Sequence, residues 1–233
     1  FAELAEEVGL PAGAVNIICG TGAEAGAALA SHQDIDLITF TGSVRTGQSI
    51  LRAASERIIP CVLELGGKSA GIVFSGADVD NAVSNIIAGI YENAGQVCDS
   101  MSRIIVHEDI HDAVMDELSS RVSKFTVGPG LDDHDITPLV SQTQLDRVCE
   151  YVQIGAREGA RVVVGGERHG ELPGYFHQAT IFTDVTSNMR INREEIFGPV
   201  LSTISFKVPE EAVKIGNDTI YGLAAAVWSK DIT

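Results

Sequence analysis

Basic side chains are scarce in this sequence. Its 233 residues include 16 lysines and arginines against 32 aspartates and glutamates, which gives a formal net charge of −16. Nucleic acids and anionic membranes are bound by basic surfaces, so this charge argues against both as partners. The sequence also lacks an apolar run long enough to span a bilayer, and it lacks a signal peptide. We therefore expect no nucleic-acid partner and no membrane partner.

Paired cysteines and clustered histidines are absent as well. The four cysteines lie far apart and form no CxxC pair. In a chain of this length that pattern predicts reduced thiols and a cytoplasmic protein. The six histidines show no HxH spacing, and the one HxxxH pair, His107 and His111, joins the end of a predicted strand to the start of a predicted helix instead of lying on one helix face, so we expect no metal site.

The sequence has no initiator methionine. It begins with Phe1 inside the amphipathic run FAELAEEVG, and it stops at Thr233 soon after the strand-like run AAAVWS. We interpret it as a segment of a longer protein.

Helix-like and strand-like runs alternate along the chain, which predicts the α/β fold class. Before residue 66, the pattern predicts strands at 15–19, 35–40 and 60–65 and helices at 23–32 and 44–55. Strands joined by helices imply a mostly parallel sheet that is covered on both faces. After residue 67 the pattern restarts, with helices predicted at 78–94, 110–125, 142–158 and 209–218 and strands at 103–108, 161–166, 177–185, 199–206 and 224–229. We therefore place a domain boundary near Gly66–Gly67.

One cysteine has polar neighbours. Cys98 in NAGQVCDSMSR is preceded by Gln96 and followed by Asp99 and Ser100. A cysteine thiol is an intrinsically strong nucleophile, and a reactive one must be reachable by its substrate. The other reading is a packing residue, which is how we interpret the remaining cysteines, Cys19, Cys61 and Cys149.

A glutamate interrupts an apolar strand in LELGGKSA. Glu64 precedes two glycines, and a carboxylate among apolar neighbours costs free energy unless it is paired, hydrated or used. This setting suits a general base. The alternative is a structural salt bridge, for example to Lys68.

Two glycine-containing turns link predicted strands to predicted helices. CGTGAEAGAAL resembles a dinucleotide fingerprint, but its spacing is GxGxxxG, and tight packing of the glycines explains it equally well. In ITFTGSVRTGQSI a strand ends at Thr41, and a helix follows Gly42 and Ser43 directly. Helix N-termini favour anions, so the Ser43 hydroxyl is a candidate phosphate donor. The plainer reading of Ser43 is a helix cap.

The run REEIFGPV holds two adjacent acids. Glu194 and Glu195 precede a small apolar group and a Gly-Pro turn. A turn with solvated acids explains the pattern, and so does a carboxylate that binds sugar hydroxyls.

Together these segments resemble the aldehyde dehydrogenase superfamily. The matching stretches are FTGSVRTG, LELGGKSA, GQVCDSMSR, EEIFGPV and YGLAAAVWSKD, and they occur in the order and at the separations typical of the family. The resemblance covers essentially the whole chain, which would be about the middle half of a family member. It implies part of a Rossmann-like NAD(P)-binding sheet in residues 1–66, followed by a truncated α/β catalytic domain in residues 67–233.

The resemblance also implies roles for single residues. Cys98 matches the catalytic nucleophile, and Glu64 matches the general base. The positions that match the cofactor site are Gly22 beside the adenine, Gly42 and Ser43 at the pyrophosphate, Leu65 and Gly66 after the base, and Glu195 with Phe197 at the nicotinamide ribose. No metal ligand is implied.

The implied reaction is the oxidation of an aldehyde to a carboxylic acid, with NAD, or alternatively NADP, as cofactor. Two alternatives stay open: a coenzyme A-acylating semialdehyde dehydrogenase, which the presence of Glu64 disfavours, and a non-catalytic relative. Ala70 and Met101 depart from the family pattern near the substrate mouth, so the sequence leaves the aldehyde open. The resemblance further implies a homodimer or homotetramer of the full-length protein. We expect the segment alone to be inactive, because a second oxyanion donor and the end of the substrate tunnel would lie outside it.

Overall fold

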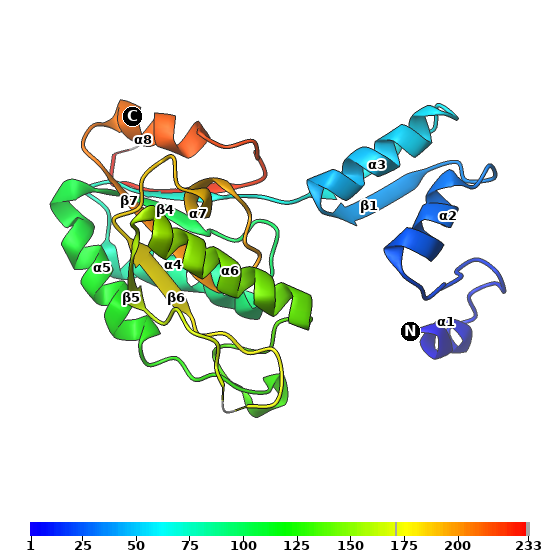
Figure 1. Ribbon diagram of the computed structural model, residues 1–233. Helices are drawn as coiled ribbons and strands as arrows, with labels where there is room; N and C mark the ends of the chain where they lie inside the picture. The colour runs from blue at the N-terminus through cyan, green and yellow to red at the C-terminus, as the bar shows by residue number, and fades with distance from the viewer. Residues whose placement is uncertain (171, 232–233) are drawn as a thin grey trace. The chain divides into compact units, whose positions relative to one another are not determined.

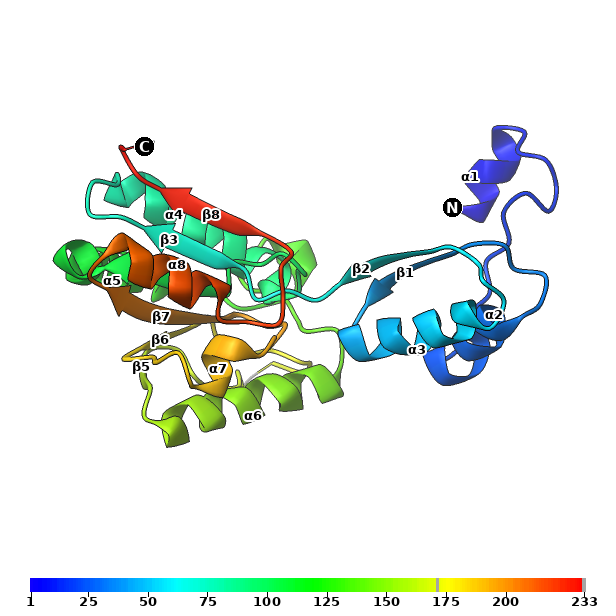
Figure 2. The same ribbon diagram turned by 90° about the horizontal axis from the view of Figure 1, so that it is seen from above.

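The computed structural model describes residues 1–170 and 172–231. The chain divides into two compact units, Phe1–Leu65 and Gly66–Thr233. Both contain parallel strands connected by helices, as the α/β pattern of the sequence predicts (Figures 1 and 2).

The first unit contains a two-stranded parallel sheet. Strand β1 (Ile38–Gly42) pairs with β2 (Cys61–Leu65), and helix α3 (Val44–Ser55) connects them. Ser43 caps α3, because its hydroxyl accepts a hydrogen bond from the Thr46 amide at 3.2 Å. The other helical segments of this unit are α1 (Ala2–Glu7), the single π-helical turn η1 (Gly22–Gly26) and α2 (Ala27–Ser31).

The prediction of a strand at residues 15–19 is wrong. These residues have no regular secondary structure, and the side chains of Ile17 and Ile18 are 63% and 71% exposed. An apolar run becomes a buried strand only where another strand satisfies its amides and carbonyls. In the described chain, β1 and β2 form ladders only with each other. Cys19 is exposed for the same reason, so its prediction as a packing residue is also wrong.

The second unit is built on a six-stranded sheet. The strand order is β5-β6-β7-β4-β3-β8, and every neighbouring pair is parallel except β5 with β6. The strands are β3 (Ala70–Val73), β4 (Arg103–His107), β5 (Arg161–Val164), β6 (Thr180–Thr183), β7 (Val200–Phe206) and β8 (Ala225–Trp228).

Helices cover both faces of this sheet, and alternate strand residues supply the two cores. Ile104 and Val106 of β4 pack in the larger core, whereas Ile105 packs in the smaller one. Figure 1 shows α8 on one side of the sheet and α4 and α6 on the other. The helices are α4 (Val79–Tyr91), α5 (Glu108–Val122), α6 (Gln142–Glu158), α7 (Arg190–Arg193) and α8 (Pro209–Asn217), with short turns η2 (Glu92–Gly95) and η3 (Gly130–Asp132).

Most predicted elements are found within a few residues of their predicted bounds. Asp78 caps α4 as expected, since its carboxylate accepts a hydrogen bond from the Asn81 amide. The sequence pattern missed β3 and α7, which have four residues each and therefore show no clear periodicity. Across residues 1–170 and 172–231, the helices are too short or too polar to cross a membrane.

Candidate active site

Cys98 lies half-buried in the turn that leads from α4 to β4. After α4 the chain passes through Asn93, Ala94 and Gly95, whose φ angles are 49°, 55° and 72°. A left-handed backbone conformation destabilises a residue that has a Cβ atom by roughly 1–2 kcal/mol. Such a stretch therefore persists only where contacts with the surrounding structure hold it in place. We interpret this left-handed turn as the feature that places Cys98.

Gly95 is fixed by close approach of a second loop. A Cβ atom on Gly95 would lie 2.2 Å from the carbonyl oxygen of Gly198, which leaves no room for a side chain. The motif that contains Cys98 therefore contacts the motif that contains Glu195, although about a hundred residues separate them in sequence.

The Gly66–Gly67 turn lies between these two loops. A Cβ atom on Gly66 would lie 2.3 Å from Oε2 of Glu195, and one on Gly67 would lie 2.4 Å from the carbonyl oxygen of Cys98. The Gly67 amide also donates a hydrogen bond to Oε1 of Glu195 at 3.3 Å. The structure thus brings the Glu195 carboxylate and the Cys98 backbone against residues 66–67, where the close approach of the Cys98 carbonyl leaves no room for a side chain at Gly67.

The Glu195 carboxylate is partly buried, and burial raises its pKa. Three neighbours oppose that shift: the Gly67 amide, the Arg147 guanidinium and the Lys68 ammonium. A partly buried carboxylate with free acceptor positions suits the binding of hydroxyl groups.

One face of α6 holds the backbone of this loop. Gln144 donates hydrogen bonds to the carbonyls of Ile196 and Phe197, and Arg147 donates to those of Glu195 and Ile196. These bonds support Phe197, a residue with a left-handed backbone (φ 61°) and a 36% exposed side chain. The loop that carries Glu195 and Phe197 is therefore positioned by a neighbouring helix.

The sequence analysis missed Gln144 and Arg147. Their spacing of three residues on a predicted helix places them on one face of that helix. This shared face was the feature of the sequence that could have identified them as a pair. Nothing in the sequence says that this face lies against residues 195–197.

Gly22, Gly42 and Ser43 belong to the first unit. A Cβ atom on Gly22 would meet nothing within 4 Å, and Gly22 lines a mostly apolar cavity of about 450 Å³ bounded by η1, α2, β1 and α3. At Gly42 the same position lies 2.5 Å from the Phe40 ring, so a side chain there would require that ring to move. Ser43 caps α3, which agrees with the plainer reading and leaves the hydroxyl exposed at the helix start.

Glu64 and Leu65 end β2 with opposite orientations. Glu64 is exposed on the same side of the strand as Val62, so its carboxylate is not desolvated within this unit, contrary to the burial that the apolar strand suggests. Leu65 packs toward α3, where a Cβ atom on Gly47 would lie 2.7 Å from its Cδ2 atom.

These residues fit a dinucleotide. In the first unit, the 450 Å³ cavity beside Gly22 offers an apolar surface and Ser43 offers a hydroxyl at a helix start, which suit a flat base and a phosphate. In the second unit, the Glu195 carboxylate offers acceptor oxygens that suit ribose hydroxyls. Within the part of the chain that the structure describes, no three His, Cys, Asp or Glu side chains are grouped as metal ligands.

Known proteins resemble this chain along its whole length. The sequence profile of the aldehyde dehydrogenase family matches residues 1–233. An aldehyde dehydrogenase from Aspergillus niger is 52% identical over 234 residues, and a betaine aldehyde dehydrogenase from Bacillus subtilis is 45% identical. The NAD⁺ complex of a Bacillus cereus aldehyde dehydrogenase is 44% identical and superimposes with a TM-score of 0.96 over 99% of this chain.

The chain spans about half the length of these proteins. It covers 47% of the Aspergillus niger enzyme, 48% of the Bacillus subtilis enzyme and 47% of the Bacillus cereus structure. About half of each of these proteins thus has no counterpart in residues 1–233.

Proposed function

The chain belongs to the aldehyde dehydrogenase family, and from that premise we propose that the complete protein oxidises an aldehyde to a carboxylic acid, with NAD as hydride acceptor. The contact of Cys98 and Glu195 with one Gly66–Gly67 turn is the observation that carries this proposal. It places the backbone of a nucleophilic residue and a hydroxyl-binding carboxylate against the same short segment, residues 66–67.

Cys98 is the nucleophile. Its thiolate sulfur forms a bond to the aldehyde carbon, and the carbonyl oxygen becomes an oxyanion. The Cys98 amide is available to stabilise that charge, because no described residue accepts a hydrogen bond from it. Bound NAD supplies the hydride acceptor, and loss of the hydride from the carbon leaves a thioester on Cys98.

Glu64 is the general base of the second half of the reaction. Its carboxylate takes a proton from water, the resulting hydroxide adds to the thioester carbon, and the carbon–sulfur bond breaks. The products are the carboxylic acid and a Cys98 thiolate ready for another turnover. Overall, aldehyde, NAD⁺ and water give acid, NADH and a proton.

The residues proposed to contact the cofactor are assigned from the family resemblance, for each unit by itself. In the first unit the residues are Gly22, Gly42, Ser43 and Leu65, and in the second they are Gly66, Glu195 and Phe197. The support is the open space at Gly22, the exposed cap at Ser43 and the hydroxyl-binding geometry of Glu195. Residues 1–66 would then be the end of the cofactor-binding domain, and residues 67–233 most of the catalytic domain.

Further features of the complete protein follow from the family resemblance. We expect a homodimer or homotetramer in the cytoplasm, with NADP as an alternative cofactor. The four free cysteines of the chain support a reducing compartment.

The test is an aldehyde panel assayed with the complete protein and with NAD and NADP in parallel. Betaine aldehyde belongs in the panel, since two relatives are named for it. Free acid as product together with NADH supports the proposal, whereas acyl-coenzyme A formed only when coenzyme A is added would identify the acylating alternative. No reduced cofactor with any aldehyde would contradict the proposal.

A further inference from the structure

Gln96, two residues before Cys98, has no part in the chemistry proposed above, yet its side chain makes two hydrogen bonds. Its Oε1 atom accepts one from the Val140 amide at 2.8 Å, and its Nε2 atom donates one to the Asn93 carbonyl at 3.1 Å. A glutamine amide holds both a donor and an acceptor, so it makes the two bonds at once. Gln96 therefore links the left-handed turn before Cys98 to a residue 44 positions later in the chain.

The turn before Cys98 closes on Gln96. The Gln96 main-chain amide donates to the Asn93 carbonyl at 3.2 Å, and the Asn93 side chain donates to the Gln96 carbonyl at 3.2 Å. Within residues 1–170 and 172–231, the bond to Val140 is the one hydrogen bond that leads from residues 93–98 to a distant segment. The side chain of Gln96 is thus the polar support of this turn from outside.

The segment that Gln96 binds is firmly placed. Leu139 is buried, and its amide donates a hydrogen bond to the Tyr175 carbonyl at 2.9 Å. Ser141 caps α6, since its hydroxyl accepts a hydrogen bond from the Gln144 amide at 3.2 Å. The Val140 amide lies between these two fixed residues, so it is a stable anchor at the start of α6.

The same helix supports the loop that carries Glu195. Gln144 and Arg147 of α6 donate hydrogen bonds to the main-chain carbonyls of residues 195–197. The Cys98 turn, through Gln96, and the Glu195 loop therefore have the first part of α6 as a common support.

The chain after Cys98 is anchored to a different helix. The Ser100 hydroxyl and the Met101 amide both donate hydrogen bonds to the Gly89 carbonyl of α4, at 3.1 Å and 3.0 Å. Cys98 thus lies on a short span between the Gly89 contacts on one side and Gln96 on the other. Loss of either support would let this span move.

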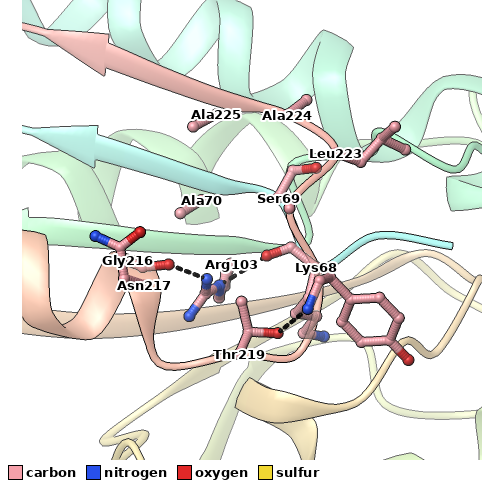
Figure 3. Close-up of a pocket in the computed structure, with 12 residues that line it drawn as sticks. Lys68, Ser69, Ala70, Arg103, Gly216, Asn217, Thr219, Leu223, Ala224 and Ala225 are labelled. Atoms are coloured by element: carbon pink, nitrogen blue, oxygen red, sulfur yellow. Dashed lines mark hydrogen bonds between the residues drawn. The ribbon is translucent and has the colours of Figure 1, made fainter.

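The segment that faces the Cys98 carbonyl is held without Gln96. Lys68 directly follows Gly67, and its carbonyl accepts a hydrogen bond from the buried Arg103 guanidinium at 2.8 Å (Figure 3). Removal of the Gln96 side chain should therefore move the Cys98 turn relative to Gly67, instead of moving both together.

We propose that Gln96 is a positioning residue for the Cys98 thiol. By tying the turn before Cys98 to the start of α6, it holds the sulfur in a fixed place relative to the loop of Glu195. Gln96 acts through the backbone of the turn, and the inference rests on the function proposed above, in which Cys98 is the nucleophile.

The test replaces Gln96 by methionine in the complete protein. Methionine has a similar length and makes neither hydrogen bond. A single-turnover experiment, with saturating enzyme in excess over the aldehyde, measures the rate constant of NADH formation. A displacement of about 1 Å at a reacting group costs about a hundredfold in rate, so we expect this constant to fall by about tenfold to a hundredfold. The Kd for NAD should stay normal, because Gln144 and Arg147 still hold the Glu195 loop.

Two further variants separate positioning from general stability. Gln96→Glu keeps an acceptor oxygen for the Val140 amide and loses only the donor to Asn93, so it should restore most of the lost rate. Gln153→Met, on an exposed position of α6, is the matched control and should react normally. A purely structural role would reduce the amount of folded protein, which leaves the single-turnover rate constant of the folded enzyme unchanged.

Several results overturn the inference while the proposed function stands. They are a normal rate constant in the Gln96→Met protein, a Gln96→Glu protein that is equally slow, and equal slowing in the Gln153→Met protein. A loss of NAD affinity as large as the loss of rate also overturns it, because Gln96 would then act on the cofactor site. An unmodified protein that forms no NADH with any aldehyde contradicts the proposed function itself, and this inference with it.

Discussion

The backbone amide of Gly67 donates a hydrogen bond to the carboxylate of Glu195, which lies 128 residues later in the chain. The same glycine has the carbonyl oxygen of Cys98 on its Cβ side. Gly67 is therefore a spacer that sets the separation between the Cys98 turn and the Glu195 loop. Its two contacts explain why the sequence places glycine immediately after the strand that carries Glu64.

Gly67→Ala should disable the enzyme without unfolding it. The new Cβ atom would lie 2.4 Å from the Cys98 carbonyl oxygen, so the turn that carries the thiol has to shift. A displacement of about 1 Å at a reacting group costs about a hundredfold in rate, so we expect kcat to fall by about that factor. Steady-state kinetics and thermal unfolding of the complete protein check this.

Gly170→Ala is the matched control, because a Cβ atom at Gly170 would meet nothing within 4 Å. It should keep normal kinetics. Normal kcat in the Gly67→Ala protein would mean that the Gly66–Gly67 turn does not position Cys98.

Cys98→Ala should abolish aldehyde oxidation while NAD still binds. The reaction requires a sulfur nucleophile at this position, and alanine removes it without adding bulk. Activity assays of the complete protein test the loss of aldehyde oxidation, and calorimetry tests whether NAD still binds. Substantial turnover by this variant would remove Cys98 from the mechanism.

Serine replacements at the other three cysteines provide the comparison. Cys149 has its thiol pKa raised, mainly by burial, so it is poorly suited to act as a thiolate. Neither Cys19 nor Cys61 is among the residues that lie against Gly66 or Gly67. Each serine variant should keep activity within an order of magnitude.

Some of this site could be predicted from the sequence and some could not. Cys98, Glu64 and Glu195 stand in motifs with unusual local chemistry, so their residue types alone raised the hypotheses. Ser43 was found at the start of a helix because a strand, a glycine and a hydroxyl residue follow one another. The positions of β1, β2 and the helices followed from periodicity, which is a local property.

The supporting contacts depend on which distant segments meet. Gln144 and Arg147 belong to an ordinary amphipathic helix, and only the fold shows that they hold the backbone of residues 195–197. From the sequence, Lys68 was considered only as a salt-bridge partner of Glu64, and only the fold shows that its side chain is buried. The error at residues 15–19 has the same origin, since burial of a strand requires neighbours that the strand's own sequence does not specify.

Glu64→Gln should separate the two halves of the reaction. A base that activates water is not needed until the thioester has formed, so the first turnover should still release NADH. We expect a burst of about one NADH per active site, followed by very slow steady turnover. Rapid-mixing fluorescence of NADH measures both phases. Loss of the burst itself would show that Glu64 activates the Cys98 thiol instead.

Cofactor binding should weaken in acid because of Glu195. Burial raises the pKa of this carboxyl above its ordinary value. As the pH falls through the raised pKa, the carboxylate gains a proton and loses charge and acceptor capacity toward hydroxyl groups. We therefore expect the KM for NAD to rise as the pH falls from 7 toward 5, with a smaller change in kcat.

Glu195→Gln serves as the control for this pH dependence. Glutamine has similar volume and cannot be ionised, so the KM for NAD should be high at pH 7 and nearly constant down to pH 5. A KM in the Glu195→Gln protein that rises in acid as steeply as in the unmodified protein would assign the titration to another group.

A chain limited to residues 1–233 should show no measurable aldehyde oxidation. It contains Cys98 and Glu64, yet it spans only about half the length of its relatives. One missing oxyanion donor costs about a hundred- to a thousandfold in kcat. Its apolar side chains are also widely exposed, for example Ile18 at 71% and Val227 at 59%, which favours association.

Calorimetry with NAD and an NADH-release assay should therefore both be negative, while Cys98 still reacts with a thiol reagent. The complete protein, assayed in parallel, is the positive control. Micromolar NAD binding with steady turnover by residues 1–233 would show that the two units suffice for catalysis, and that the remaining half of such an enzyme serves assembly or stability instead.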